Sequence, residues 1–384
     1  MRVLIIGDGN SIHLRNYIKV VLDSFVEVKI TLFDVTETKE RRETMYNYYL
    51  SKNITVVSAQ QDSIIPISKM VSALKLLRMV KALKNLGSFD YCIVHYIEII
   101  RVCAVLLNKS NYQKIVPVFW GSDLLRNNKI DTFYYRCFFH KAYKIVFNTE
   151  NMKGCFQKIF KDEFDNKTEV IKFPSLSFKE IERLKLTVCN EITKQTMGLP
   201  RNKYIVICGH AGTKQEQYEE LIEAISTCDS EVKERCFFVW LMTYGHSDLH
   251  EYQNKIKKLV EEKALDGVVL CNYMEHDDML KLFMCSDIYI TTIKTDAFSG
   301  VMQENLYVGA MLIYGKWLNY YEIENSEIIA RSVDKVSDIT KALNEVVINY
   351  EKLKPKLKDN SILISEISAP ESIKNLWFEK VFML

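Results

Sequence analysis

Several absences in the sequence exclude whole classes of protein. No window approaches the roughly 20 apolar residues that a membrane-spanning helix needs. The 10 cysteines form no C-x-x-C pair and stand at no zinc-finger spacing from the 7 histidines, so we expect reduced thiols and no zinc module. The formal net charge is only +2, whereas a protein that binds nucleic acid usually carries a clear basic excess. The short apolar run after Met1 leads straight into a glycine turn, unlike a signal peptide, and favours a cytoplasmic location.

What is present suffices for two hydrophobic cores. The 384 residues are 48% hydrophobic and 26% charged, an ordinary globular composition, and exceed the length that one core usually supports. Short apolar runs alternate with helical patterns, a polar stretch at 175–201 interrupts this alternation, and it then restarts. We predict two doubly wound α/β domains with parallel sheets: residues 1–175, joined by a C-terminal helix at 365–384, and residues 176–364.

The expected strands fix where functional residues should lie. They are 3–6, 28–33, 54–58, 91–95, 115–119, 145–148 and 170–173 in the first domain, and 204–208, 237–242, 268–270, 288–292 and 311–314 in the second. In open parallel sheets, ligands bind beyond the carboxyl ends of the strands. Residues that directly follow a strand are therefore the first candidates for a site.

The first strand is followed by a glycine turn and a helical pattern. Glycine lets the backbone approach an anion, and the helix N-terminus offers free N–H groups, so Gly9 and Asn10 are candidate phosphate ligands. An ordinary connection between strand and helix is the alternative. A nicotinamide-dependent oxidoreductase or epimerase, with Asp34 after the second strand, is another class to consider, although Ile12 replaces the third glycine of the dinucleotide fingerprint.

Two carboxylates lie eight positions apart near residue 300. Asp296 and Glu304 bracket Ser299 and Gly300 at the start of a predicted helix. The backbone N–H groups of such a turn suit a diphosphate, and carboxylates accept paired hydrogen bonds from sugar and ribose hydroxyls. The alternative is that the aspartate is an ordinary turn residue and the glutamate a solvated helix residue.

This segment resembles the E-x7-E motif of retaining GT-B glycosyltransferases of the family-4 type, with Asp296 in the first acidic position and Gly309 five residues after the second. A second resemblance lies at Trp120-Gly-Ser-Asp123-Leu, which is similar to a W-G-x-D-L turn of bacterial transferases. Those enzymes attach acetamido-dideoxygalactose to lipid-linked oligosaccharides, and capsule and O-antigen enzymes are related to them. The resemblance implies two Rossmann-like domains that face each other across a cleft.

It also implies an activity: transfer of a sugar, with retention, from a nucleotide-sugar donor to a glycan or lipid-linked acceptor in surface polysaccharide synthesis. Asp296, Asp123 and His95 are then the candidate catalytic residues. Ser299, Gly300 and Glu304 join the candidate donor-binding residues, with Tyr273 in a loop similar to the one that reads the base in the family.

The family places Arg and Lys after the first strand of its second domain, where they face the diphosphate. The corresponding positions here hold His210 and Lys214. Cations are expected there because negative charge develops on the leaving diphosphate. No D-x-D cluster indicates a metal ion, and the sugar nucleotide is a substrate, so no cofactor is expected. The departures at His210 and Asp296 keep a third class open, a non-catalytic GT-B-like subunit that binds sugar nucleotide.

A basic segment at 69–84 needs a separate explanation. It places Lys75, Arg78, Lys81 and Lys84 three residues apart beside apolar residues at helical spacing. Such a helix could rest on anionic lipid at the inner face of the cell membrane. The alternative is an ordinary crossover helix with its apolar side on the sheet.

Overall fold

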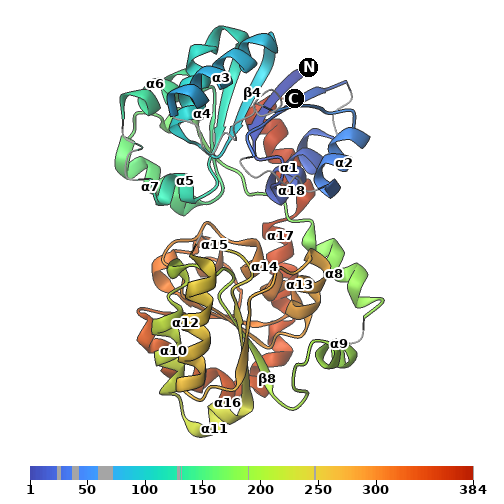
Figure 1. Ribbon diagram of the computed structural model, residues 1–384, viewed down its shortest axis with the longest axis vertical. Helices are drawn as coiled ribbons and strands as arrows, with labels where there is room; N and C mark the ends of the chain where they lie inside the picture. The colour runs from blue at the N-terminus through green and yellow to red at the C-terminus, as the bar shows by residue number, and fades with distance from the viewer. Residues whose placement is uncertain are drawn as a thin grey trace. The chain divides into compact units, whose positions relative to one another are not determined.

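The computed structural model describes residues 1–23, 27–36, 43–58, 72–127, 130, 132–188, 190–245 and 248–383 (Figure 1). The chain divides into two compact units, Met1–Pro174 with Ser368–Leu384, and Ser175–Ile367. Within the described ranges, no helix has the length and apolar character to cross a lipid bilayer.

The described part of the first unit contains one sheet of seven parallel strands in the order β3-β2-β1-β4-β5-β6-β7. The strands are β1 (Arg2–Gly7), β2 (Lys29–Asp34), β3 (Thr55–Ser58), β4 (Phe89–His95), β5 (Tyr112–Val118), β6 (Ile145–Phe147) and β7 (Thr168–Val170). The helices are α1 (Ile12–Tyr17), α2 (Glu43–Ser51), α3 (Ser72–Asn85), α4 (Ile99–Leu107), α5 (Ser122–Leu125), α6 (Phe133–Lys141) and α7 (Glu150–Phe160). Strand β1 lies between β2 and β4, so the chain reverses its direction of winding between β1 and β4.

The last strand of this sheet differs from the prediction. We expected it at 170–173, but β7 ends at Val170. Beyond it, the backbone N–H of Phe173 donates to the side-chain Oδ1 of Asn148 over 2.8 Å, so the chain has left the sheet. The apolar residues that follow β7 are buried or half-buried by loop packing, which produced a strand-like pattern.

The described part of the second unit contains one sheet of six parallel strands in the order β10-β9-β8-β11-β12-β13. They are β8 (Tyr204–Cys208), β9 (Cys236–Leu241), β10 (Gly267–Leu270), β11 (Ile288–Thr291), β12 (Met311–Gly315) and β13 (Ala330–Val333). The helices are α8 (Ser177–Lys185), α9 (Asn190–Thr196), α10 (Tyr218–Ser226), α11 (Ser230–Arg235), α12 (Leu249–Glu262), α13 (His276–Met284), α14 (Gly300–Val308), α15 (Tyr321–Glu324), α16 (Ile339–Leu357) and α17 (Asp359–Ile367).

Strand β8 shows why the second sheet is buried on both sides. Ile205 and Ile207 pack into a cluster with α8, α13 and α14, whereas Val206 and Cys208 pack into a second cluster with α10, α12 and α16. Alternate residues of a strand point to opposite faces, so an unbroken apolar run requires helices on both. The predicted α/β class with two doubly wound sheets is confirmed.

The C-terminal segment belongs to the first unit. Helix α18 (Pro370–Trp377) continues into a π-helical turn, η8 (Phe378–Phe382). The ring of Trp377 lies 4.8 Å from that of Tyr17, and the ring of Phe382 lies 5.0 Å from that of Tyr91. Figure 1 shows α18, in red, beside α1, in blue. The core of this unit is therefore assembled from both ends of the chain.

Candidate functional site

In the second unit, the loops that follow β8 and β11 are bonded to each other. These strands are neighbours at the point where the direction of winding reverses. The N–H of Lys294 donates to the carbonyl of Gln215 over 2.8 Å, and the hydroxyl of Thr292 donates to the carbonyl of Glu216 over 2.9 Å. The positions predicted to bind phosphate and those predicted to bind sugar are thus held together at one sheet edge.

The loop after β8 is shaped by two glycines. Gly209 has a φ of 62°, a conformation that L side chains rarely adopt. At Gly212, an added Cβ would stand 2.1 Å from Cδ1 of Leu249, and the N–H of this glycine donates to the carbonyl of Tyr244 over 2.7 Å. The loop after β8 therefore packs tightly against the segment that leads from β9 into α12.

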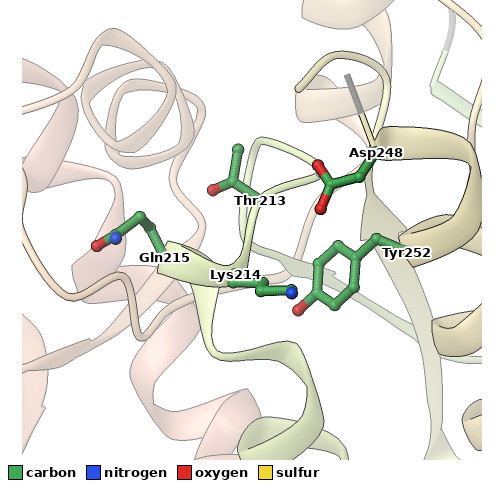
Figure 2. Close-up of a pocket in the computed structure, with 6 residues that line it drawn as sticks. Thr213, Lys214, Gln215, Asp248 and Tyr252 are labelled. Carbon is green, nitrogen blue, oxygen red and sulfur yellow. The ribbon is translucent and has the colours of Figure 1, made fainter. Parts of the chain in front are cut away.

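A pocket lies against this loop. Its lining consists of Gly212, Thr213, Lys214, Gln215, Asp248 and Tyr252. Figure 2 shows Lys214 extending toward the ring of Tyr252, with the carboxylate of Asp248 on the same side. Lys214 is exposed, and no ion pair joins it to a described acid. An ammonium group without an internal partner can bind a phosphate directly.

His210, in the same loop, faces a buried acid. Its Nδ1 lies 3.2 Å from Oε1 of Glu216, whose side chain has no exposed surface. Burial raises the pKa of Glu216, and the positive charge of His210 opposes that rise. The two groups form no hydrogen bond with each other at this distance, so the carboxylate becomes an ion-pair partner of the imidazole only when the ring is protonated.

Asp296 is held by one of its two oxygens. Oδ2 accepts hydrogen bonds from the N–H of Ser299 over 2.8 Å and from the hydroxyl of Tyr320 over 2.5 Å. Among the described residues, no hydrogen bond reaches Oδ1. The carboxylate is therefore oriented by protein groups and retains an oxygen that can accept a substrate hydroxyl.

Helix α14 begins beside this acid. Ser299 caps it, because its hydroxyl accepts from the N–H of Met302 over 3.4 Å. The preceding Phe298 has a φ of 66°, which costs a non-glycine residue about 1 kcal/mol. Its carbonyl accepts a hydrogen bond from the side chain of Gln303 over 2.9 Å. The strained turn presents the first amides of α14, including that of Gly300, with a helix dipole behind them.

Glu304 lies close to the same turn and is almost fully buried, with 7% of its surface exposed. Its Oε1 lies 3.8 Å from the point where a Cβ on Gly300 would stand. Burial raises the pKa of Glu304 to about 7, while a hydrogen bond with Ser177 and the charge of His276 oppose the rise. The solvated-helix interpretation of this residue is wrong, since a solvated glutamate would be exposed.

The remaining predicted residue of this unit is Tyr273. It lies in the loop after β10, two strands from β8 in the sheet, and its side chain is 59% exposed. Its loop therefore opens at the same edge of the sheet, on the side of β9 and β10.

In the first unit, Asp123 organises two loops. Its Oδ1 accepts from the N–H groups of Trp120 (3.0 Å) and Gly121 (2.9 Å), and its Oδ2 accepts from that of Ile97 (2.8 Å). The side chain is buried, which raises its pKa to about 6 although the three amides oppose the rise. Three backbone amides thus use most of the acceptor capacity of Asp123 and tie the Trp120 turn to Ile97, which favours a positioning role over the predicted sugar contact.

His95, at the end of β4, contacts the same turn through Trp120. Its Nδ1 accepts a hydrogen bond from Nε1 of Trp120 over 3.1 Å. The ring has no exposed surface, and burial lowers its pKa to about 3, so it is neutral at physiological pH. A direct sugar contact by His95 would require surface that this ring does not have. The ring instead orients Trp120.

An aromatic platform lies above His95. The half-buried rings of Trp120 and Phe173 are 5.7 Å apart, and the exposed ring of His13 lies 5.7 Å from the first and 5.5 Å from the second. All three follow strands at the carboxyl edge of the first sheet. Aromatic faces of this kind pack against the apolar faces of sugar rings or lipids.

The predicted phosphate turn after β1 is already occupied. The N–H of Gly9 donates to Oδ1 of Asp34 over 3.0 Å, and that of Asn10 donates to Oδ1 of Asp8 over 2.9 Å. Asp34 also accepts from the hydroxyl of Tyr46. These two carboxylates occupy the amides and would repel a further anion, which argues against the predicted phosphate contact of Gly9 and Asn10. The same bonds occupy the acid that a nicotinamide cofactor would need for its ribose.

Comparison with known proteins gives similarity of fold. No family model and no curated protein matches the chain. Among solved structures, the Anabaena protein HepE in complex with UDP and glucose is similar over 100% of both chains, with a TM-score of 0.72 and 13% identity. The two proteins therefore have the same fold, with two Rossmann-like domains in each chain. The fold is GT-B. A sucrose-phosphate synthase from Thermosynechococcus elongatus (TM-score 0.75, 12% identity, 100% of this chain and 99% of that one) is also similar. So is a glycosyltransferase from Rickettsia africae (0.69, 16%, 97% and 98%).

Several residues at these sites are invisible to motif reasoning. Tyr320 and Glu216 belong to the site only because they contact predicted residues: Tyr320 contacts Asp296, and Glu216 contacts His210. Ser177 lies more than a hundred residues before its partner Glu304. A tyrosine after a strand or a serine at a helix start carries no signal of its own. Only the folded chain brings such groups to an acid.

Proposed function

We propose that this protein is a glycosyltransferase that moves a sugar from a nucleoside-diphosphate donor to a glycan or lipid-linked acceptor, with retention, in surface polysaccharide synthesis. The observation that carries the proposal is the bonded pair of loops after β8 and β11, which puts cations and oriented acids at one sheet edge.

Each part of that edge suits one part of a sugar nucleotide. Lys214, His210 and the first amides of α14 would face the diphosphate, where charge accumulates as the bond between the sugar and the phosphate breaks. The free Oδ1 of Asp296 would accept a hydrogen bond from a sugar hydroxyl. Glu304, once ionised, would accept hydrogen bonds from the ribose hydroxyls. Tyr273 would lie beside the base.

The reaction requires little further chemistry from the chain. The electron pair of the bond to the sugar leaves with the diphosphate, an acceptor hydroxyl oxygen forms the new bond, and the proton of that hydroxyl passes to an oxygen of the departing diphosphate. The aromatic platform of His13, Trp120 and Phe173 would hold the acceptor, with Asp123 and His95 as positioning residues beneath it. No step in this scheme calls for a metal ion or a redox cofactor.

The first test is donor binding by isothermal titration calorimetry. UDP and UDP-glucose are the first ligands to try, because structures of the similar HepE contain them, and a panel of other sugar nucleotides follows. We expect Glu304→Ala to remove binding and Glu261→Ala, at an exposed position on α12, to preserve it. Unchanged affinity of Glu304→Ala for every nucleotide that the parent binds would overturn the assignment.

A second test separates catalysis from binding alone. The replacements at His210 and Asp296 relative to the family motif favour one other candidate, a subunit that binds sugar nucleotide without turning it over. Release of nucleoside diphosphate by the purified chain, with or without acceptor, would exclude that candidate. Binding without release, under conditions where a known transferase is active, would favour it.

A further inference from the structure

Three neighbouring helices of the first unit carry positive charge without any acid. Helix α4 packs against both α3 and α6 (Figure 1). Together their residues include seven Lys or Arg and no Asp or Glu, in a chain whose formal net charge is only +2. Arg101 and Arg136 are ion-paired with Glu98 and Glu163, which lie outside the three helices. The cations of α3 therefore contribute most of the uncompensated charge on this side of the sheet.

The solvent-facing stripe of α3 mixes these charges with large apolar side chains. Leu74 and Leu77 are 51% and 65% exposed, and they share the stripe with Arg78, Lys81 and Lys84. Met79 and Leu83 on the opposite side are buried, so this stripe is not needed to cover the sheet. Among the residues that the structure describes, no acid pairs with the three cations of the stripe.

The neighbouring helices extend the same surface. Ile99 at the start of α4 is 42% exposed, and Phe133 and Tyr134 at the start of α6 are 74% and 54% exposed. Crossover helices of a parallel sheet run against the strands, so the first turns of α3, α4 and α6 all lie toward the carboxyl edge. The exposed apolar side chains thus gather near the edge that carries Trp120, and most of the cations lie behind them.

We infer that this surface, the exposed residues of α3 with the first turns of α4 and α6, docks on an anionic phospholipid membrane. Clustered Lys and Arg are attracted to acidic headgroups, while exposed Leu and Phe enter the boundary between headgroups and acyl chains. A soluble polyanion would satisfy the cations and leave the apolar side chains in water, so lipid is the partner that fits both. The inference does not depend on which sugar nucleotide the second unit binds.

The experiment is co-sedimentation of the full chain with vesicles of phosphatidylcholine alone and of equal parts phosphatidylcholine and phosphatidylglycerol. We expect binding only to the second kind. Since each cation near an anionic surface contributes about a fivefold factor, the triple variant Arg78→Gln, Lys81→Gln, Lys84→Gln should lower the partition coefficient about a hundredfold. The charge-matched control Lys257→Gln, Lys352→Gln, Lys356→Gln, on exposed positions of the second unit, should not.

A second variant tests the apolar part. Leu74→Ser with Leu77→Ser should weaken vesicle binding and leave binding to heparin, a soluble polyanion, unchanged. No binding to the anionic vesicles, or an equal loss in the control triple variant, would overturn the inference. So would unchanged vesicle binding of the Leu74 and Leu77 variant, because the surface would then be a general anion-binding one.

Discussion

Replacing the buried Glu304 should change the stability of the fold and the binding of the donor in opposite directions. Burial raises its pKa from 4.5 to about 7 in the folded chain. Between these values the unfolded chain has lost the proton and the folded chain retains it, so stability decreases as pH rises through this window and the loss is complete above pH 7. The difference of about 2.5 units corresponds to about 3 kcal/mol.

Glu304→Gln removes this penalty because its amide stays neutral. We expect the variant to be more stable than the parent by about 3 kcal/mol at about pH 8, and nearly equal to it at about pH 4, where the parent carboxyl is protonated in both the folded and the unfolded chain. Urea denaturation at both pH values measures this difference, with Glu261→Gln as an exposed control.

The same variant should lose donor binding, which calorimetry measures, and binding by the parent should weaken as pH falls below 7 because Glu304 must be ionised to accept two hydroxyl hydrogen bonds. A stability difference between variant and parent that is the same at both pH values would refute the buried-acid reasoning. Loss of binding in a variant that is more stable would show that the acid acts on the ligand and not on the fold.

Three further variants test other parts of the second unit. Gly212→Ala would put a methyl group 2.1 Å from a leucine side chain and should destabilise the fold by about 1–3 kcal/mol in urea denaturation, whereas Gly154→Ala, in open space within α7, should stabilise it slightly. Tyr320→Phe should weaken donor binding about tenfold by calorimetry, since it removes a hydrogen bond to a charged acid, and Tyr321→Phe, an exposed neighbour, should leave the affinity unchanged. Lys214→Ala should also weaken binding about tenfold in low salt, with the difference from the parent shrinking as salt is added, and a salt-independent loss would argue against a phosphate contact.

The accuracy of the strand predictions follows from burial. Strand β8 begins and ends where it was predicted, because its apolar run is bounded by Lys203 and Gly209 and buried on both faces. Strand β13 was not predicted. It is an edge strand of four residues, Ala330–Val333, in which Arg331 and Ser332 are exposed, so its pairing with β12 leaves no apolar pattern.

The site divides along similar lines. Asp296 and Glu304 could be found because both lie within one short motif at a helix start. The environment of each could not, since the pKa of Glu304 depends on its burial in the fold and the orientation of Asp296 depends on Tyr320. Asp123 shows the converse: a motif identified the residue, but its three bonds to backbone amides could not be read from the motif.

The return of α18 and η8 to the first unit has a consequence for synthesis. Trp377 and Phe382 complete a core that begins with Val3, yet the ribosome makes them only after all of the second unit. Domains usually fold in the order in which they emerge. Here, the first unit lacks part of its core until α18 and η8 have been translated, whereas the second unit is already complete at that point.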